Sequence, residues 1–437
     1  MGDLDLLYAR WQMGLSLAFH IVFAVIGMAM PAMMVAAEVA WLRTERPEYI
    51  ELAKRWARGT AILFAVGAVS GTVLSFELGL LWPAFMAAAG PIIGMPFSLE
   101  GFAFFLEAIF LGLYLYGWQK LSPTAHVFAG IIVSLAGALS GAFVVTANAW
   151  MNTPAGFRLE NGQFVDIDPF AAMFNPAAGA QVVHMLLASY AAVGVGVAGI
   201  HARLLLRDSE SPFHRRALVI ALLVGLPASL LQPLSGDSAG RVVARTQPAK
   251  FGALEGHFQT EPYAPLRIGG VPDVDRGETR YALEIPGGLS VLAHGNPAAP
   301  VTGLNDIPRD LWPPVMVVHI AFQVMVAIGM WLAFLAIWAA VLWWRKRLFE
   351  SSPFLKAVFW STPLGFIAIE AGWTVTEFGR QPWIIHGVMR TSEAVTPMPG
   401  LVVPFVLFTL LYIGLAAVVI MLIRRTVLET APKGRAR

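Results

Sequence analysis

The sequence predicts an all-α polytopic membrane protein, and three observations support that prediction. Hydrophobic residues make up 57% of the chain and charged residues only 13%, whereas about 25% of a soluble protein is charged. Apolar runs long enough to cross a bilayer, for which ~20 residues suffice, recur along the whole chain. Basic residues gather in alternate connections between these runs. We therefore expect one membrane domain built from helices that cross the bilayer in series.

Nine apolar runs predict nine transmembrane helices. They lie near 12–42, 57–82, 95–118, 124–150, 178–205, 215–234, 313–343, 354–376 and 399–423. The first run follows Asp3 and Asp5 rather than a basic leader and is too long for the core of a cleavable signal peptide, so we expect it to be retained. The chain then divides into helices one to six at 1–234, a large loop at 235–312, and helices seven to nine with a tail at 313–437.

The basic residues predict the orientation of these helices. They cluster after the first, fifth, seventh and ninth runs, at Arg43, Arg46, Lys54, Arg55, Arg58, Arg203, Arg207, Arg215, Arg216, Arg345, Lys346, Arg347, Lys356, Arg424, Arg425, Lys433, Arg435 and Arg437. Short loops rich in lysine and arginine face the cytoplasm. The N-terminus and the loop at 235–312 are therefore predicted outside and the C-terminus inside.

Composition also excludes several kinds of site. The chain has no cysteine, which excludes thiolate metal sites, iron–sulfur clusters, covalent c-type haem attachment and disulfides. The formal charge of +2 reflects the asymmetry of the loops and implies no nucleic-acid partner.

Four side chains of metal-ligating type fall in the outer half of the predicted bundle. His20, His184, Met325 and Glu377 lie on the first, fifth, seventh and eighth helices. A haem iron takes axial ligands from facing helices, and imidazole, thioether and carboxylate are all suitable. The sequence thus predicts a haem-binding helical bundle. Each residue also has a structural alternative: hydrogen bonding between helices for the histidines, packing for Met325, and an ion pair with Arg380 for Glu377.

Two acids on the third helix predict a proton relay. Glu100 and Glu107 are seven residues apart, which places them on one helical face two turns apart. Stacked intramembrane acids can pass protons through hydroxyl groups or water, and Ser140 and Asn148 on the fourth helix are candidate bridging groups. The alternative is a pair of protonated acids that cross-link helices. Glu77 and Glu370 are further intramembrane acids.

Polar residues mark two segments at the predicted outer face. Residues 372–383 carry Glu377, Arg380, Gln381 and two tryptophans where an apolar run leaves the membrane, which indicates the wall of a polar site. The loop at 235–312 is hydrophilic, and it is either a cap or a lid over such a site.

These motifs together resemble subunit I of the cytochrome bd-type quinol oxidases, from about residue 8 to 425. The resemblance is carried by Gly372-Trp373, Glu377-Phe378-Gly379-Arg380-Gln381-Pro382-Trp383, Glu100-Gly101, Phe104-Phe105-Leu106-Glu107, Ala147-Asn148-Ala149-Trp150-Met151, Asn175-Pro176 and Gln181-Val182-Val183-His184.

The resemblance implies a set of cofactors and their ligands. His184 and Met325 would be the axial ligands of a low-spin haem b. His20 and Glu377 would hold two high-spin haems, a high-spin haem b and a haem d, with a further haem b as the alternative to haem d. Which of the two ligands serves which haem stays open. Arg380 and Trp373 match positions near these haems.

The resemblance also implies roles for loop and relay residues. Lys250 and Glu255 match the loop positions implicated in quinol oxidation, and Glu100, Glu107, Ser140 and Asn148 match the proton route and haem surroundings. The chain departs from many relatives at Gln323, where they have an arginine two residues before the methionine ligand. Loss of that charge should make the low-spin haem easier to oxidise unless another group compensates, and it resembles the cyanide-insensitive branch.

The function implied is that of a respiratory terminal oxidase in the bacterial cytoplasmic (inner) membrane. It would oxidise quinol, either ubiquinol or menaquinol, at the outer face and reduce dioxygen to water, generating a proton motive force without pumping. The partners implied are a second integral membrane subunit and, as an open point, small accessory subunits. An ion-coupled transporter is the alternative, because intramembrane acids and interrupted helices also fit it, but no internal repeat supports that class.

Overall fold

The computed structural model describes residues 3–425, and the predicted tail residues Lys433, Arg435 and Arg437 lie outside this range. Within it, nine helices are long and apolar enough to cross a membrane, which confirms the predicted fold class. They are α1 (Asp3–Thr44), α2 (Pro47–Leu81), α3 (Pro83–Tyr116), α4 (Pro123–Asn152), α6 (Ala178–Leu205), α7 (Pro212–Thr246), α10 (Val315–Trp344), α11 (Ser352–Trp360) together with α12 (Leu364–Gly379), and α14 (Val402–Ile423). Four of them, α2, α3, α4 and α7, begin with proline, whose missing N–H costs nothing in the first turn.

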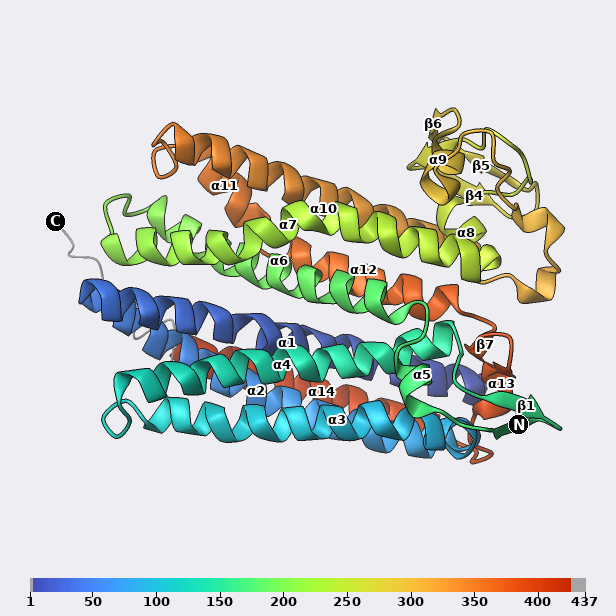
Figure 1. Ribbon diagram of the computed structural model, residues 1–437, viewed down its shortest axis with the longest axis horizontal. Helices are drawn as coiled ribbons and strands as arrows, with labels where there is room; N and C mark the ends of the chain where they lie inside the picture. The colour runs from blue at the N-terminus through green and yellow to red at the C-terminus, as the bar shows by residue number, and fades with distance from the viewer. Residues whose placement is uncertain (1–2, 426–437) are drawn as a thin grey trace.

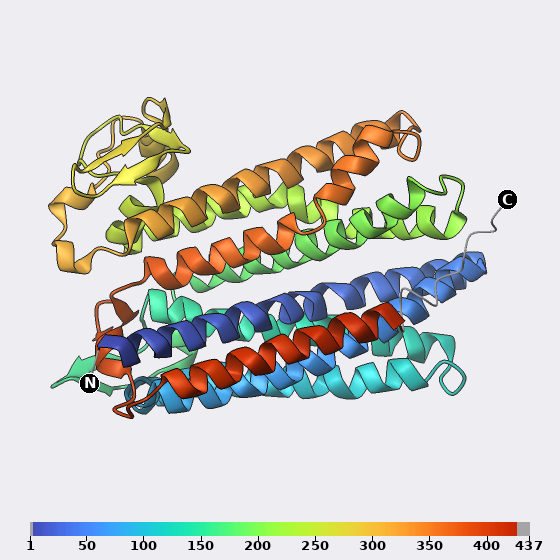
Figure 2. The ribbon, with the colours of Figure 1, turned by 180° about the vertical axis from the view of Figure 1, so that it is seen from behind.

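The helices run side by side along the long axis and form two groups (Figure 1). One group contains α1 to α4 with α14, and the other contains α6, α7 and α10 to α12 (Figures 1 and 2). Neighbours in sequence pack as pairs, α1 with α2, α3 with α4, and α6 with α7, while α1 and α4 also contact α6. The two groups therefore meet along α1, α4 and α6.

Short elements gather at one end of the bundle, where α1 begins, and α14 ends toward the opposite end (Figures 1 and 2). We call the first of these the loop end. Its elements are β1 (Arg158–Glu160), β2 (Gln163–Val165), α5 (Pro169–Met173), α8 (Pro248–Glu255), β3 (Leu266–Ile268), β4 (Val271–Asp273), β5 (Glu278–Arg280), β6 (Leu283–Ile285), α9 (Gly288–His294), η1 (Leu304–Asp306), η2 (Arg309–Leu311), β7 (Trp383–Ile385), β8 (Met389–Arg390) and α13 (Thr391–Ala394). The strands form four antiparallel pairs: β1 with β2, β3 with β6, β4 with β5, and β7 with β8.

Helix α7 is longer than its apolar run. It continues to Thr246, so the start of the predicted loop at 235 is helical. The added stretch is polar, and hydropathy detects the part of a helix that lies in lipid rather than the turns that project beyond it. The predicted eighth span also differs, because it is two helices, α11 and α12, separated at 361–363.

Helices α6 and α7 approach each other more closely than side chains would allow. A Cβ atom on Gly194 would lie 2.4 Å from the Cα atom of Gly225 and 2.9 Å from the carbonyl oxygen of Ala221. Small residues at such crossings let helix backbones meet in a membrane. The contact between Gly194 and Gly225 therefore fixes the position of α6 along the axis of α7, and with it the position of His184.

Candidate functional site

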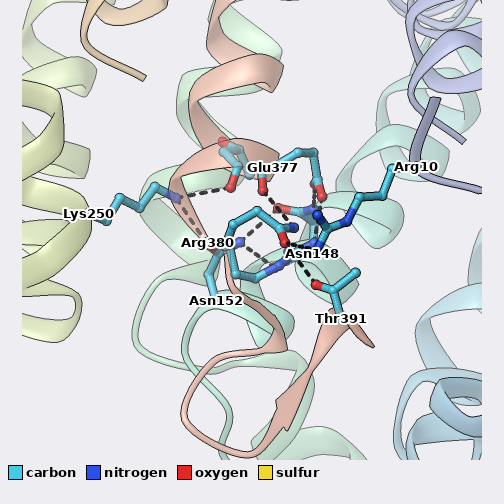
Figure 3. Close-up of polar contacts among 9 residues, drawn as sticks. Arg10, Asn148, Asn152, Lys250, Glu377, Arg380 and Thr391 are labelled. Atoms are coloured by element: carbon cyan, nitrogen blue, oxygen red, sulfur yellow. Dashed lines mark hydrogen bonds and ion pairs between the residues drawn. The ribbon is translucent and has the colours of Figure 1, made fainter. Parts of the chain in front are cut away.

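An ion pair at the C-terminal end of α12 is the centre of the site. The Arg380 Nη2 atom lies 2.5 Å from Glu377 Oε2, and Asn148 on α4 donates from Nδ2 to Glu377 Oε1 at 2.5 Å. Figure 3 shows the three side chains converging between α4 and α12. Both carboxyl oxygens thus have donors, so the Glu377 side chain is held in one orientation.

A chain of amide groups connects this ion pair to the large loop. Asn152, one turn after Asn148, donates from Nδ2 to Asn148 Oδ1 at 3.1 Å. Lys250 on α8 donates from Nζ to Asn152 Oδ1 at 3.0 Å and to the Thr376 carbonyl at 3.4 Å (Figure 3). The lysine stem packs on Gly379, where a Cβ atom would lie 2.8 Å from Lys250 Cε. Lys250 is therefore part of the cluster, although it is far from Glu377 in sequence.

The two candidate loop residues face different surroundings although both lie on α8. Burial, and to a smaller extent the Arg380 charge, lower the pKa of Lys250 to about 7, against the opposing effect of Glu377. Burial raises the pKa of Glu255 to about 8, against the opposing charge of Arg267. Glu255 Oε2 is buried without a hydrogen-bond partner among residues 3–425. Both groups therefore titrate near neutral pH, where a group that accepts or releases protons works best.

Gln381 ties the polar segment after α12 to the rest of the loop end. Its Oε1 atom accepts from Arg10 Nη2 at 3.1 Å and from Thr391 Oγ1 at 3.0 Å (Figure 3). The segment at 372–383 thus lines a polar site, in agreement with its composition.

His20 on α1 is held by a serine on α2. Its Nδ1 atom lies 3.0 Å from Ser70 Oγ, and that hydroxyl donates to the Val66 carbonyl at 3.0 Å. The serine oxygen therefore accepts from Nδ1–H, which leaves the lone pair on Nε2. A Cβ atom on Gly71 would lie 3.0 Å from His20 Cε1. The glycine leaves room for the ring, and the tautomer is the one that can bind a metal through Nε2.

His184 on α6 has the same arrangement with α7. Its Nδ1 atom lies 3.0 Å from Ser235 Oγ, which donates to the Gln232 carbonyl at 2.9 Å. Nε2 then accepts from Gln232 Nε2 at 3.2 Å. A Cβ atom on Gly236 would contact the ring at 3.5 Å. Two histidines on different helices thus share one pattern: a serine fixes Nδ1 and leaves Nε2 as the basic nitrogen.

Met325 on α10 lies against another glycine. A Cβ atom on Gly372 would come within 3.1 Å of Met325 Sδ, so this sulfur requires a glycine on α12. The next residue, Trp373, packs against the main core.

These donors fit iron held in a macrocycle better than a bare ion. Among the residues that the structure describes, no group of three or more histidine, aspartate or glutamate side chains could hold a metal ion. Haem needs only one or two axial ligands, and His20, His184, Met325 and Glu377 present one donor each from four helices. Arg380 is 3% exposed, and its Nε and Nη1 atoms have no partner in the described chain. Those free donors suit an anionic group such as a propionate.

The predicted relay residues lie deeper in the bundle. Ser140 donates to Glu100 Oε1 at 3.4 Å. Glu107 is 5% exposed, and its Oε1 atom has no partner among residues 3–425. It lies between glycines of α1 and α4: a Cβ atom on Gly27 or Gly137 would be 3.5 or 3.2 Å from that oxygen. The two acids lie on one face of α3, as the sequence predicts.

Sequence reasoning missed several partners of these residues. Asn152 was detectable, because it follows Asn148 by four residues on the same helical face. Ser70 and Ser235 come from neighbouring helices, and no local pattern identifies them. A further buried pair, Glu38 Oε1 and His126 Nδ1 at 2.7 Å, links α1 to α4.

Comparisons with known proteins agree on one family. A family model described as cytochrome bd terminal oxidase subunit I matches residues 8–431. The chain is 37% identical over 423 residues, 95% of each chain, to the putative cytochrome bd menaquinol oxidase subunit I of Bacillus subtilis strain 168. It is 30% identical over 443 residues to the cytochrome bd ubiquinol oxidase subunit 1 of the same strain, covering 98% of this chain and 94% of that one. The solved bd oxidase of Geobacillus thermodenitrificans superposes with a TM-score of 0.91 and 42% identity over 98% of this chain and 99% of the other.

Proposed function

The chain belongs to the cytochrome bd terminal oxidase subunit I family, and from that premise we propose that its loop end oxidises quinol and its four candidate ligands hold haem iron. As a member of this family it is a multi-pass membrane subunit of a bacterial respiratory terminal oxidase, a quinol:oxygen oxidoreductase. The family carries haem cofactors.

The haem assignment is the one that the family resemblance implies. His184 and Met325 would hold a low-spin haem b, and His20 and Glu377 would hold the high-spin haem b and a haem d or further haem b. Bound haem supplies one-electron redox chemistry and the site at which dioxygen is reduced to water. The chain's own contribution is to fix each ligand: the serines orient the two imidazoles, and Arg380 and Asn148 orient Glu377. Trp373 lies beside Gly372 on the same helix.

The loop end is proposed as the quinol site. A quinol releases two protons with its two electrons, so the site needs a proton acceptor whose pKa lies close to the working pH. Glu255 meets this need, because burial raises its pKa to about 8 and one of its oxygens has no partner within the described chain. Lys250, whose pKa is about 7, joins this loop to Asn152 and the Glu377 cluster.

Proton movement across the membrane follows from the orientation. The loop end lies outside by the distribution of basic residues, so protons from quinol leave outside. Those consumed in reducing dioxygen would arrive from the cytoplasm through Glu107 and then Glu100. A proton motive force results without a pump. We further propose a second integral membrane subunit beside this one, and either ubiquinol or menaquinol as the donor, since the names of the relatives include both.

The observation that carries the proposal is the hydrogen-bonded chain from Lys250 through Asn152 and Asn148 to Glu377. It connects the loop to a candidate ligand. Glu255→Gln and Lys250→Ala in the assembled membrane enzyme separate the two roles. Glu255→Gln should lower quinol turnover ~100-fold, the range of a positioned acid–base group, and leave the haem spectrum and turnover with an artificial donor unchanged.

Lys250→Ala should lower quinol turnover and also alter the spectrum of the centre at Glu377, because it removes the donor to Asn152. Glu261→Gln is the matched control for Glu255→Gln, because it makes the same substitution at another glutamate of the same loop. Normal quinol kinetics in Glu255→Gln would show that the donor site lies elsewhere.

A further inference from the structure

Two side chains on α10, His319 and Gln323, reach out of the helix bundle to the large loop. They are four residues apart, which places them on the same face one turn apart. His319 is fully buried. Neither belongs to the set of candidate ligands or proton carriers, so their contacts need another explanation.

Gln323 holds the turn between β3 and β4 with both ends of its amide. Its Oε1 atom accepts from the Gly269 N–H at 2.9 Å, and its Nε2 atom donates to the Arg267 carbonyl at 3.1 Å. An arginine at 323 could donate to that carbonyl but could not accept from the N–H, because a guanidinium has no acceptor. A glutamine at 323 therefore satisfies both backbone groups, whereas an arginine would satisfy only one.

His319 holds two parts of the loop at once. Its Nδ1 atom lies 2.8 Å from the Leu254 carbonyl in α8, and its Nε2 atom lies 3.2 Å from the Gly269 carbonyl. Both partners are acceptors, so the neutral ring donates to one of them, and only the imidazolium donates to both.

These contacts converge on the end of α8 that carries Glu255. Leu254 precedes that residue and Gly256 follows it, in the left-handed region at φ +59°. The Gly256 carbonyl accepts from Thr279 Oγ1 at 2.7 Å and from Arg267 Nη1 at 3.4 Å. A Cβ atom on Gly256 would lie 2.5 Å from Thr279 Oγ1 and 3.3 Å from His319 Nδ1. The backbone on both sides of Glu255 is thus held directly or indirectly from α10.

The same helix carries Met325, two residues after Gln323. We infer that His319 and Gln323 are positioning residues that form a clasp, and that the clasp fixes Glu255 in the donor loop relative to Met325. This inference rests on the proposed function, because it assumes that quinol is oxidised at this loop. It gives Gln323 a structural role in place of the charge that an arginine would supply.

The test compares variants of the assembled enzyme in membranes. Gln323→Leu and His319→Phe should each lower kcat/KM for quinol about tenfold, as expected for losing two hydrogen bonds that position a reacting group. Turnover with an artificial donor and the low-spin haem spectrum should be unchanged. Amide hydrogen exchange at 267–270 should become faster. Gln323→Glu, which keeps the acceptor for Gly269 but loses the donor to Arg267, should fall between Gln323→Leu and the parent.

Ile320→Ala is the matched control, since Ile320 lies on the same helix between the two residues and is 41% exposed. If Gln323→Leu or His319→Phe fails to assemble, the size-preserving Gln323→Glu and His319→Gln carry the test. Parental quinol kinetics in the assembled variants would overturn the clasp. A changed low-spin spectrum would also overturn it, because the residues would then act on the haem ligand rather than on the loop.

The outcome separates the clasp from the proposed function. If Glu255→Gln already leaves quinol turnover intact, the donor site itself is wrong. If Glu255→Gln impairs turnover and the α10 variants do not, only the clasp is wrong.

Discussion

Glu377 at the loop end and Glu107 in the middle of the bundle are held in opposite ways. At the loop end, both oxygens of Glu377 accept hydrogen bonds, from Arg380 and Asn148. In the middle, Glu107 keeps one buried carboxyl oxygen without a partner in the described part of the chain. A fully bonded carboxylate is fixed in place, whereas an unbonded oxygen remains available to water and protons. Under the proposed function, this difference separates Glu377, which would hold geometry, from Glu107, which would carry protons.

Breaking the ion pair at the loop end should have the largest effect. Arg380→Ala leaves the partly exposed Glu377 carboxylate beside Asn148 without its cation, at a cost below the ~3–5 kcal/mol for breaking a fully buried pair. We expect loss of the spectrum of the centre at Glu377 and of oxygen reduction. Absorption spectra of purified enzyme test this, with Arg241→Ala as the control, since its pair with Asp237 is exposed. An unchanged spectrum would mean that Glu377 does not depend on Arg380.

Glu107→Gln should have the next largest effect and should act on a different step. The amide keeps the size of the side chain but cannot transfer a proton, so oxygen reduction should slow ~100-fold or more, while haem reduction by quinol continues. Single-turnover oxidation of the reduced enzyme, followed with a pH dye, measures the uptake. Glu370→Gln, on α12, should change it at most a few-fold. Normal uptake in Glu107→Gln would make this glutamate a structural acid.

Asn152 tests whether the large loop and the Glu377 ion pair are joined through side chains. Asn152→Leu removes the link between Lys250 and Asn148, and the loss of these hydrogen bonds should lower quinol turnover about tenfold. Asn152→Asp keeps the acceptor for Lys250 and loses the donor to Asn148, so it should retain more activity than the leucine variant. Steady-state kinetics with quinol distinguish the two. Equal activities would show that the Asn152–Asn148 bond is dispensable.

The pH dependence of quinol oxidation should show the smallest effect. Below pH 8 the Glu255 carboxyl is mostly protonated, because burial raises its pKa to about 8, and a base must be deprotonated to act. The value of kcat/KM should therefore rise with pH through about 8 and then level off, and Glu255→Gln should lack this rise. The same raised pKa means that folding binds a proton between pH 4.5 and 8, so Glu255 lowers stability as pH rises there. A pH profile identical in both enzymes would exclude Glu255 as the base.

The sequence was sufficient for the helices, but not for the partners of the candidate ligands. Apolar runs of membrane length predict spanning helices directly, and the histidines, Met325 and Glu377 lie on the helices expected. The serines beside His20 and His184 could not be predicted, because such contacts depend on the rotation and height of separate helices. Lys250 was expected in a loop remote from the candidate ligands. The fold of that loop places the Lys250 side chain in the Glu377 cluster. The sequence identified Gln323 only as a position that lacks the arginine of many relatives. Its hydrogen bonds to a distant loop have no signature in the local sequence.

The contact between Gly194 and Gly225 has a consequence for the speed of electron transfer. His184 lies on one of these helices, and its partners Gln232 and Ser235 lie on the other. Because the backbones touch, His184 and its partners move as one body, and a change in the charge of an iron held there would displace them only slightly. A small displacement lowers the reorganisation barrier that each electron must cross. A methyl group in Gly225→Ala should separate the helices and slow electron arrival at the His184 centre, measurable by rapid-mixing spectroscopy, although no ligand is altered.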